Sequence, residues 1–154
     1  RTTVDSYFEI LEETLIGNRL PGIQLNLFKK ETIHPKFYFF DSGIARAAAG
    51  YSDTEIDSTW RGHSFEALVY NDFIIELTKK TITKKSSYLA IEVKFSKTWD
   101  RRWSQILNQF IDLEKSPIEK AVGIYTGDKI LTQGNVTIYP VSIFLNLLYK
   151  DEFF

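Results

Sequence analysis

The sequence contains no cysteine and no methionine. Without cysteine the chain has neither a disulfide framework nor a thiolate metal site, which fits the reducing environment of the cytoplasm. Methionine is missing even at position 1, so we expect the chain to be a piece of a longer protein. No apolar run is long enough to cross a bilayer, and no signal peptide opens the chain. We therefore predict a cytoplasmic protein with no membrane segment.

The sequence also has no strong excess of either charge. Its 154 residues carry a net charge of −1, which argues against a surface coated in basic charge, although local basic clusters can still bind nucleic acid. Hydrophobic residues make up 44% of the chain and aromatic residues 15%, as is typical of a globular protein. A chain of this length forms one domain, or one domain with part of a second.

The spacing of apolar residues predicts a mixture of helices and strands. Helices are expected at residues 2–13, 44–49, 65–77, 99–113 and 142–149. Strands are expected at residues 23–28, 36–40, 90–96, 121–125 and 136–141. The order of these elements predicts an α/β sandwich with a mixed sheet, in which the strand at 90–96 belongs to a hairpin. Asp41, at the end of a strand, is expected to cap a turn or a helix.

The strand at 90–96 is the most informative segment. Ile91, Val93 and Phe95 are β-branched or aromatic, and side chains alternate between the two faces of a strand. Glu92 and Lys94 therefore project together from the opposite face. A carboxylate that can hold a divalent cation, beside an ammonium that can steady a phosphate or an attacking water, suits phosphodiester chemistry. The alternative is an edge strand with one polar face.

A second acidic residue, Glu66, begins an otherwise apolar stripe of the helix at 65–77. The apolar residues on the same helical face are Val69, Tyr70, Phe73 and Leu77. Glu66 is either a first-turn acid favoured by the helix dipole or a carboxylate that points across the edge of the core toward the strand of Glu92. Both interpretations stay open at this point.

These motifs resemble those of a known nuclease superfamily. Gly62-x-x-Phe65-Glu66 opens a helix, Ile91-Glu92-Val93-Lys94-x-Ser96 forms a strand, and a further helix and strand follow, an order that resembles the PD-(D/E)xK superfamily. More narrowly, nearly the whole chain resembles the C-terminal half of a prokaryotic AAA+ ATPase family whose tail is a nuclease-like domain of unknown function. The narrower resemblance also rests on Thr3-Val4-x-x-Tyr7, Leu11-Glu12-x-Thr14-Leu15, Leu20-Pro21, Lys36-x-Tyr38-x-Phe40-Asp41-x-Gly43 and the segment 140–154.

The resemblance implies a fold and a set of partners. Residues 36–154 are expected to form a restriction-endonuclease-like α/β domain, with a mixed central sheet flanked by helices. Residues 1–35 are expected to be the end of a winged-helix unit that follows the ATPase domain. The implied partners are DNA and the N-terminal ATPase domain of the same protein, and oligomerisation stays open. No Gly-rich phosphate loop of the Walker type occurs, so no nucleotide site is expected in this chain.

The resemblance also implies a metal site, with one gap. Glu66 matches the helix glutamate that supports the metal, Glu92 the acid that binds it, and Lys94 the lysine beside the scissile phosphate; the metal is Mg²⁺, with Mn²⁺ as a substitute. The family places an aspartate on the strand before Glu92, in a segment resembling Trp-Arg-x-x-x-Gly-x-Glu-Val-Asp-Phe. Nothing like it occurs between Leu77 and Leu89. Either a segment of the protein is missing from the sequence at this place, or this protein has lost the aspartate. Without the aspartate we expect little or no cleavage.

Basic and polar residues around the strand of Glu92 are candidate DNA contacts, although each could equally belong to a solvated loop. The candidates are Lys84, Lys85, Ser96, Lys97, Arg101 and Arg102. Three functions follow from the sequence. The first is a metal-dependent DNA nuclease, and the second is a nuclease-like fold without catalysis that binds DNA or a protein for the ATPase. The third is a purely structural domain in which Glu92 and Lys94 form a surface ion pair of little energetic worth.

Overall fold

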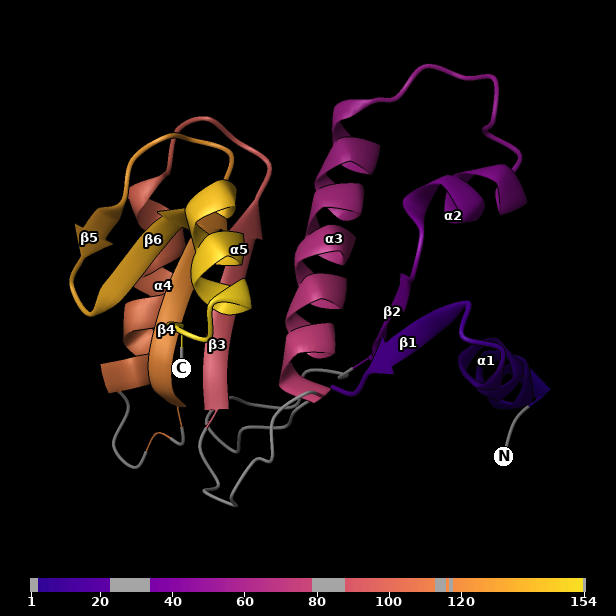
Figure 1. Ribbon diagram of the computed structural model, residues 1–154, viewed down its shortest axis with the longest axis horizontal. Helices are drawn as coiled ribbons and strands as arrows, with labels where there is room; N and C mark the ends of the chain where they lie inside the picture. Colours follow the sequence, from indigo (N-terminus) through magenta and orange to yellow (C-terminus); the bar gives the residue numbers. More distant parts are fainter. Residues whose placement is uncertain (1–2, 23–33, 79–87, 113–115, 117, 154) are drawn as a thin grey trace. The chain divides into compact units, whose positions relative to one another are not determined.

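The computed structural model describes residues 3–22, 34–78, 88–112, 116 and 118–153, and its chain divides into two units, Arg1–Ile56 and Asp57–Phe154 (Figure 1). The sequence predicts a boundary between residues 35 and 36 instead. That position lies inside the first unit, because the strands on either side of it are hydrogen-bonded to each other. The first unit is therefore larger than the sequence pattern indicates.

The first unit contains two helices and a small antiparallel sheet. Its elements are α1 (Thr3–Glu13), β1 (Gly17–Leu20), β2 (Lys36–Phe39) and α2 (Ser42–Ala48), and β1 pairs with β2. The predicted helices and the strand at 36–40 are confirmed, whereas β1 is not predicted, and the strand expected at 23–28 lies outside the described residues. Asp41 caps α2 as predicted, because its Oδ1 accepts a hydrogen bond from the backbone N–H of Ile44 at 2.9 Å.

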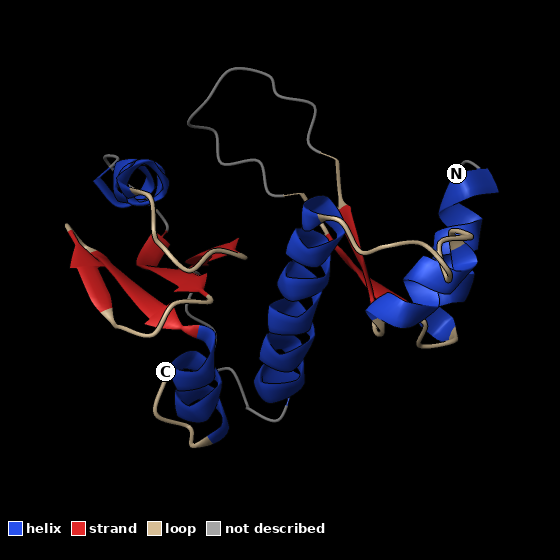
Figure 2. Cartoon of the chain, turned by 90° about the horizontal axis from the view of Figure 1, so that it is seen from above, coloured by secondary structure: helices blue, strands red, loops and turns tan. Residues whose placement is uncertain are grey.

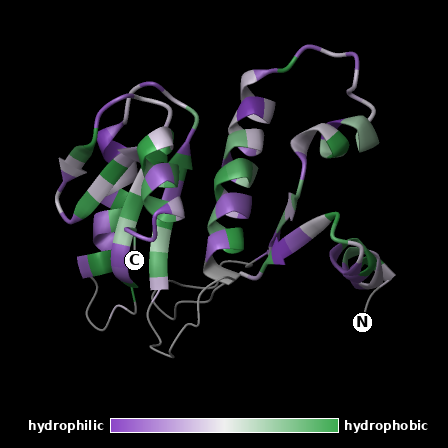
Figure 3. Cartoon of the chain, in the orientation of Figure 1, coloured by the Kyte–Doolittle hydropathy of each residue, from purple (hydrophilic) through white to green (hydrophobic). Residues whose placement is uncertain are grey.

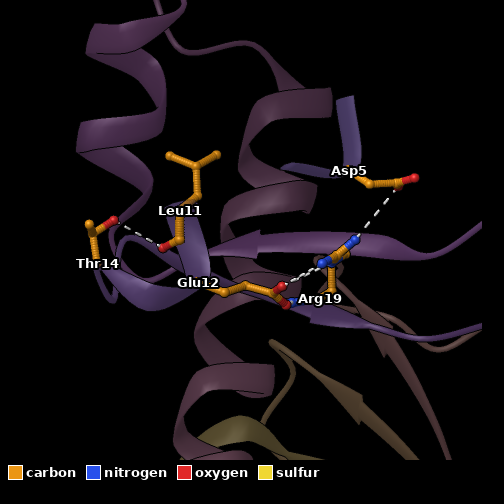
Figure 4. Close-up of polar contacts among 5 residues, drawn as sticks. All are labelled: Asp5, Leu11, Glu12, Thr14 and Arg19. Carbon is orange, nitrogen blue, oxygen red and sulfur yellow. Dashed lines mark hydrogen bonds and ion pairs between the residues drawn. The ribbon is translucent and has the colours of Figure 1, made fainter. Parts of the chain in front are cut away.

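An ion pair connects α1 to β1 (Figure 4). The Arg19 guanidinium donates from Nε and a terminal nitrogen to Glu12 Oε2 at 3.0 and 2.7 Å, and the backbone N–H of Arg19 donates to Glu12 Oε1 at 2.9 Å. Asp5 lies 3.9 Å from the same guanidinium. The side-chain and backbone hydrogen bonds from Arg19 lower the pKa of Glu12. This local clamp accounts for a strand whose sequence, Gly-Asn-Arg-Leu, has weak strand propensity.

The second unit is a mixed four-stranded sheet covered by helices. Its elements are α3 (Ser58–Thr78), β3 (Tyr88–Lys94), α4 (Arg101–Asp112), β4 (Ile118–Tyr125), β5 (Leu131–Gln133), β6 (Val136–Pro140) and α5 (Val141–Tyr149). The strand order is β3-β4-β6-β5, with β3, β4 and β6 parallel and β5 antiparallel to β6. The predicted mixed α/β sheet is confirmed. Among the described strands β3 pairs in parallel with β4, so the predicted hairpin around Glu92 does not form within them.

Helices lie on both faces of this sheet (Figures 1 and 2). On one face α3 and α5 contribute Phe65, Val69 and Phe144 to a core that includes the central strand β4. On the other face Leu107 of α4 packs against Tyr125 and the strands beneath it. The central residues of β4 are buried because both faces are covered, as expected for parallel strands.

The longest described helix, α3, contains the predicted helix at 65–77 but begins earlier, at Ser58. Hydrophobic and hydrophilic residues alternate in bands along the helix (Figure 3), and Phe65, Val69 and Phe73 form the face that packs on the core. Phe65 and Val69 are buried, whereas Leu68 and Ile75 are exposed. Within the described residues no helix combines the length and the apolar character that a membrane crossing requires.

Candidate functional site

Strand β3 separates its side chains between the two faces of the sheet, as the alternation predicts. Leu89, Ile91 and Val93 pack against the core formed with α3 and α5, whereas Ala90 packs against the core formed with α4. Glu92 and Lys94 continue the second series and so lie on the α4 face. The sequence therefore predicts correctly that these two polar side chains share one side of the sheet.

Glu92 and Lys94 are ion-paired. Lys94 Nζ lies 2.6 Å from Glu92 Oε1, and each side chain is 35% exposed. The same ammonium lies 5.4 Å from the ring centre of Trp103 on α4, at a cation–π distance. Because the pair is partly open to water, its contribution to stability is small. The geometry instead holds one ammonium group in a defined place on the surface, between a carboxylate and an aromatic ring.

The ring of Trp103 belongs to an aromatic layer that the sheet supports. Trp103 packs edge-on against Trp99 with ring centres 5.1 Å apart, and Trp99 packs edge-on against Tyr125 at 6.1 Å. Trp99 Nε1 donates to the hydroxyl of the buried Ser104 at 2.7 Å. Gly123 lies beneath Trp99, because a Cβ atom at this glycine would come within 2.4 Å of the indole. This support fixes the aromatic ring next to Lys94.

The Glu92–Lys94 pair lies at the carboxyl ends of the parallel strands. Lys94, Tyr125 and Pro140 end β3, β4 and β6 and are paired in register. The next loops are joined there, since the backbone N–H of Thr126 donates to the carbonyl of Ser96 at 3.1 Å. In open α/β sheets ligands bind outside the carboxyl ends of the strands. The location of the pair therefore matches the usual place for a binding site in such a sheet.

Glu66 is positioned differently from Glu92. It lies half-buried on α3 next to Phe65, whose ring packs against Phe95 with centres 5.7 Å apart. This contact brings the early part of α3 beside the end of β3. Phe65, Val69 and Phe73 of α3 pack against the face of β3 that lies opposite Glu92. The described residues include no cluster of three or more His, Cys, Asp or Glu side chains that could hold a metal ion.

The candidate DNA contacts fall into four groups. Lys97, just after β3, and Arg101, at the start of α4, are exposed. The Ser96 hydroxyl is used within its own loop, where it donates to the carbonyl of Thr98 at 2.7 Å. Arg102 is exposed, but its charge is balanced by an ion pair at the start of α4. Lys84 and Lys85 lie outside the described residues.

The ion pair of Arg102 strengthens the beginning of α4. Asp100 accepts a hydrogen bond from the backbone N–H of Arg102 at 2.9 Å and further bonds from its guanidinium. These side-chain and backbone hydrogen bonds lower the pKa of Asp100 to about 2. Asp100 therefore stays ionised and acts as a cap of α4, where a negative charge also favours the helix dipole. Arg101, the neighbouring residue, makes no part of this pair.

A polar hollow on the other flank of α4 is not predicted by the sequence. It has a volume of about 400 Å³ and is lined by Arg101, Ser104, Gln105, Asn108, Thr132, Gln133 and Gly134. Its walls come from α4 and from β5, elements far apart in the sequence. The only sequence signal for it is Arg101 followed at helical spacing by Gln105 and Asn108, which is equally typical of a solvated helix face.

Comparison with known families adds one finding. A family described as "Domain of unknown function (DUF8612)" matches residues 1–55, which is nearly the whole of the first unit, Arg1–Ile56. The match ends before the second unit and so contains none of Glu66, Glu92 or Lys94. No curated protein and no solved structure matches the chain.

Proposed function

We propose that the second unit, Asp57–Phe154, is a DNA-binding module with a PD-(D/E)xK, restriction-endonuclease-like fold that binds DNA without cleaving it. The observation on which the proposal rests is the position of Lys94, whose ammonium is held by Glu92 beside the ring of Trp103 at the carboxyl ends of the parallel strands. An ammonium beside an aromatic ring suits a DNA strand, because it contacts phosphate while the ring stacks on a base. Lys97, three residues after Lys94, is also exposed and adds a second positive charge.

The described residues do not fit the magnesium site that the family resemblance implies. Glu92 uses one oxygen on Lys94 at 2.6 Å, and no cluster of three or more ligating side chains occurs in the part of the chain that the structure describes. The sequence between Leu77 and Leu89 also contains no aspartate or glutamate. Mg²⁺ prefers several hard oxygen ligands in a fixed octahedral arrangement. These observations favour binding over metal-dependent cleavage.

Metal-dependent cleavage is the second candidate function. It is favoured by the pairing of an acid and a lysine on one side of β3, with Glu66 on a helix whose early part lies beside the end of the same strand. A third carboxylate ligand for the metal would have to come from a residue other than Glu66 and Glu92. The two candidates predict opposite results in the presence of metal, so they can be separated directly.

The resemblance to the AAA+ ATPase family indicates a partner for the module, namely an ATPase domain of the same protein. In that family the nuclease-like domain follows an ATPase domain and a winged-helix unit, and residues 1–35 of this chain resemble the end of the winged helix. We therefore propose that the module localises an ATPase of the same protein on DNA.

Two assays on the full 154-residue chain test the proposal. Titration calorimetry measures binding of Mg²⁺ and of Mn²⁺ to the wild type and to Glu92→Ala. Gel assays measure binding and cleavage of single-stranded, duplex and branched DNA by the same proteins. We expect DNA binding without cleavage, and no metal binding that depends on Glu92. Cleavage in Mg²⁺ that Glu92→Ala abolishes would replace the proposal with the nuclease, and absence of DNA binding would leave only a structural role.

A further inference from the structure

The polar hollow between α4 and β5 has the volume of a ligand site. Its volume of about 400 Å³ lies within the range of roughly 300–1,000 Å³ that is usual for sites of small molecules. All of its lining residues are polar or glycine, one is cationic, and none is acidic. A hollow without apolar side chains favours a ligand rich in hydrogen-bonding groups, and one with a single cation favours an anionic ligand.

Hydrogen bonds hold the walls of the hollow in place. Asn108 Nδ2 donates to the carbonyls of Ser104 and Gln133, both at 2.9 Å, and its Oδ1 accepts from the backbone N–H of Asn135 at 2.8 Å. Gly134 has a positive φ of 65°, and a Cβ atom there would come within 2.6 Å of Asn108 Oδ1. The turn after β5 is thus tied closely to α4. Walls that are fixed before a ligand binds lower the cost of binding.

Gln133, one of the lining residues, carries a polar atom without a partner. Its Oε1 is buried and accepts no hydrogen bond from the residues that the structure describes. Buried polar atoms in folded proteins almost always have a partner, so an exception calls for an explanation. When the terminal amide of Gln133 turns toward the hollow, a ligand that brings an N–H donor there supplies the missing hydrogen bond.

The two requirements, an anion and a hydrogen-bond donor, are met together by a nucleotide. Its phosphate carries the negative charge that Arg101 can bind, and its base carries N–H donors. The amide of Gln105, one helical turn after Arg101, faces the same hollow and can both donate and accept. We propose that the hollow between α4 and β5 binds one nucleotide of a single-stranded DNA segment, with Arg101 on the phosphate and Gln105 and Gln133 on the base.

This inference rests on the proposed DNA-binding function and adds a second contact area to it. Lys94 reaches Trp103 on one flank of α4, whereas the hollow opens between α4 and β5, at the other edge of the sheet. A DNA strand that contacts both places has to cross the first turns of α4. The arrangement predicts a footprint of several nucleotides, longer than a contact at Lys94 alone would give.

The test is the affinity of the full chain for a fluorescein-labelled single-stranded oligonucleotide, measured by fluorescence anisotropy. The variants are Arg101→Gln and Gln105→Ala, and the matched control is Gln109→Ala, an exposed glutamine of the same helix that does not line the hollow. We expect Arg101→Gln to weaken binding several-fold and to reduce the salt dependence by about one phosphate contact. We expect Gln105→Ala to weaken binding about three- to tenfold at unchanged net charge, and Gln109→Ala to bind as the wild type does.

The failure of this inference is distinguishable from the failure of the proposed function. If Lys94→Gln weakens binding while Arg101→Gln and Gln105→Ala do not, the hollow is not part of the DNA site and the proposed function stands. If Gln105→Ala and Gln109→Ala weaken binding equally, the loss is not specific to the hollow and the inference is overturned. If the wild type binds no DNA at all, both are overturned. Thermal unfolding of each variant verifies that it is folded.

Discussion

Lys94 Nζ lies 2.6 Å from Glu92 Oε1, on the side of β3 that faces α4. The pair has two opposite effects on a DNA strand. Lys94 attracts phosphate, whereas Glu92 repels it and neutralises part of the lysine charge. In a metal-dependent nuclease the same carboxylate would instead hold the metal ion. Without metal it repels DNA in either case, so the effect of Glu92 on DNA affinity in the presence of Mg²⁺ distinguishes a binding module from an enzyme.

We predict that Glu92→Gln raises the affinity for single-stranded DNA a few-fold in the absence of metal. The substitution removes a negative charge beside Lys94 and keeps the size of the side chain. Glu152→Gln, an equal change of charge at an exposed residue after α5, controls for the general electrostatic effect. Anisotropy titrations in EDTA measure both. A weaker affinity in Glu92→Gln than in Glu152→Gln would show that the carboxylate assists binding, contrary to the account.

We predict opposite effects on stability for alanine at two glycines. Gly123→Ala places a methyl group against Trp99, where a Cβ would approach within 2.4 Å, and should lower the free energy of unfolding by about 1–3 kcal/mol. Gly62→Ala lies within α3, with no atom within 4 Å of the added Cβ, and should raise it by about 0.5–1 kcal/mol. Tryptophan fluorescence during urea unfolding measures both, because all three tryptophans lie in the second unit. Equal effects at the two positions would contradict the packing described for Trp99.

We predict that Ser104→Ala destabilises the second unit by about 1–3 kcal/mol, because it leaves Trp99 Nε1 without its acceptor in a partly buried place. Ser142→Ala on α5, where the side chain is exposed, should change the stability by less than about 0.5 kcal/mol. The same urea titrations compare the two variants. A Ser104→Ala protein as stable as Ser142→Ala would show that the indole hydrogen bond has no structural role.

We predict a pH dependence from the contact between α5 and α3. The Tyr149 hydroxyl donates to Asp72 Oδ1 at 2.6 Å, and this bond, followed by burial and the charges of Asp72 and Glu76, raises the pKa of Tyr149 to about 12. An unfolded tyrosine has a pKa of about 10. The hydrogen bond therefore contributes its full stability below about pH 10 and loses it as the pH rises toward 12.

The absorbance of tyrosinate during an alkaline titration measures this shift. The wild type should contain a late-ionising tyrosine that is missing in Tyr149→Phe. Asp72→Ala should return that tyrosine to an ionisation near pH 10, whereas Asp128→Ala, at an exposed residue of the loop before β5, should not. A late-ionising tyrosine that persists in Asp72→Ala would show that another group causes the shift.

Local patterns in the sequence predict much of this fold. The alternation of Ile91, Glu92, Val93 and Lys94 correctly predicts both the strand and the two faces of its side chains. The short polar side chain of Asp41 correctly predicts the cap of α2. These features depend on the spacing of neighbouring residues, and spacing is what a single sequence records.

Elements stabilised by distant contacts are harder to predict. Strand β1 lacks β-branched residues and is held by its pairing with β2 and by the clamp between Arg19 and Glu12. Strand β5 differs, because the turn at Gly134 that returns its three residues to β6 is a local feature, and the sequence predictions omit it. Like β1, the hollow depends on the bond from Asn108 to the carbonyl of Gln133. No local pattern reports contacts between residues so far apart.

The most direct test of the account is the salt dependence of DNA binding by Lys94→Gln. The control is Lys150→Gln, which removes an equal charge from an exposed residue at the end of α5, on the other face of the sheet. Anisotropy titrations of single-stranded DNA over a series of salt concentrations give the slope of log affinity against log salt. The account predicts that Lys94→Gln weakens binding several-fold and reduces the slope by about 1, with Lys150→Gln close to the wild type. Equal affinities and slopes for the two variants would contradict it.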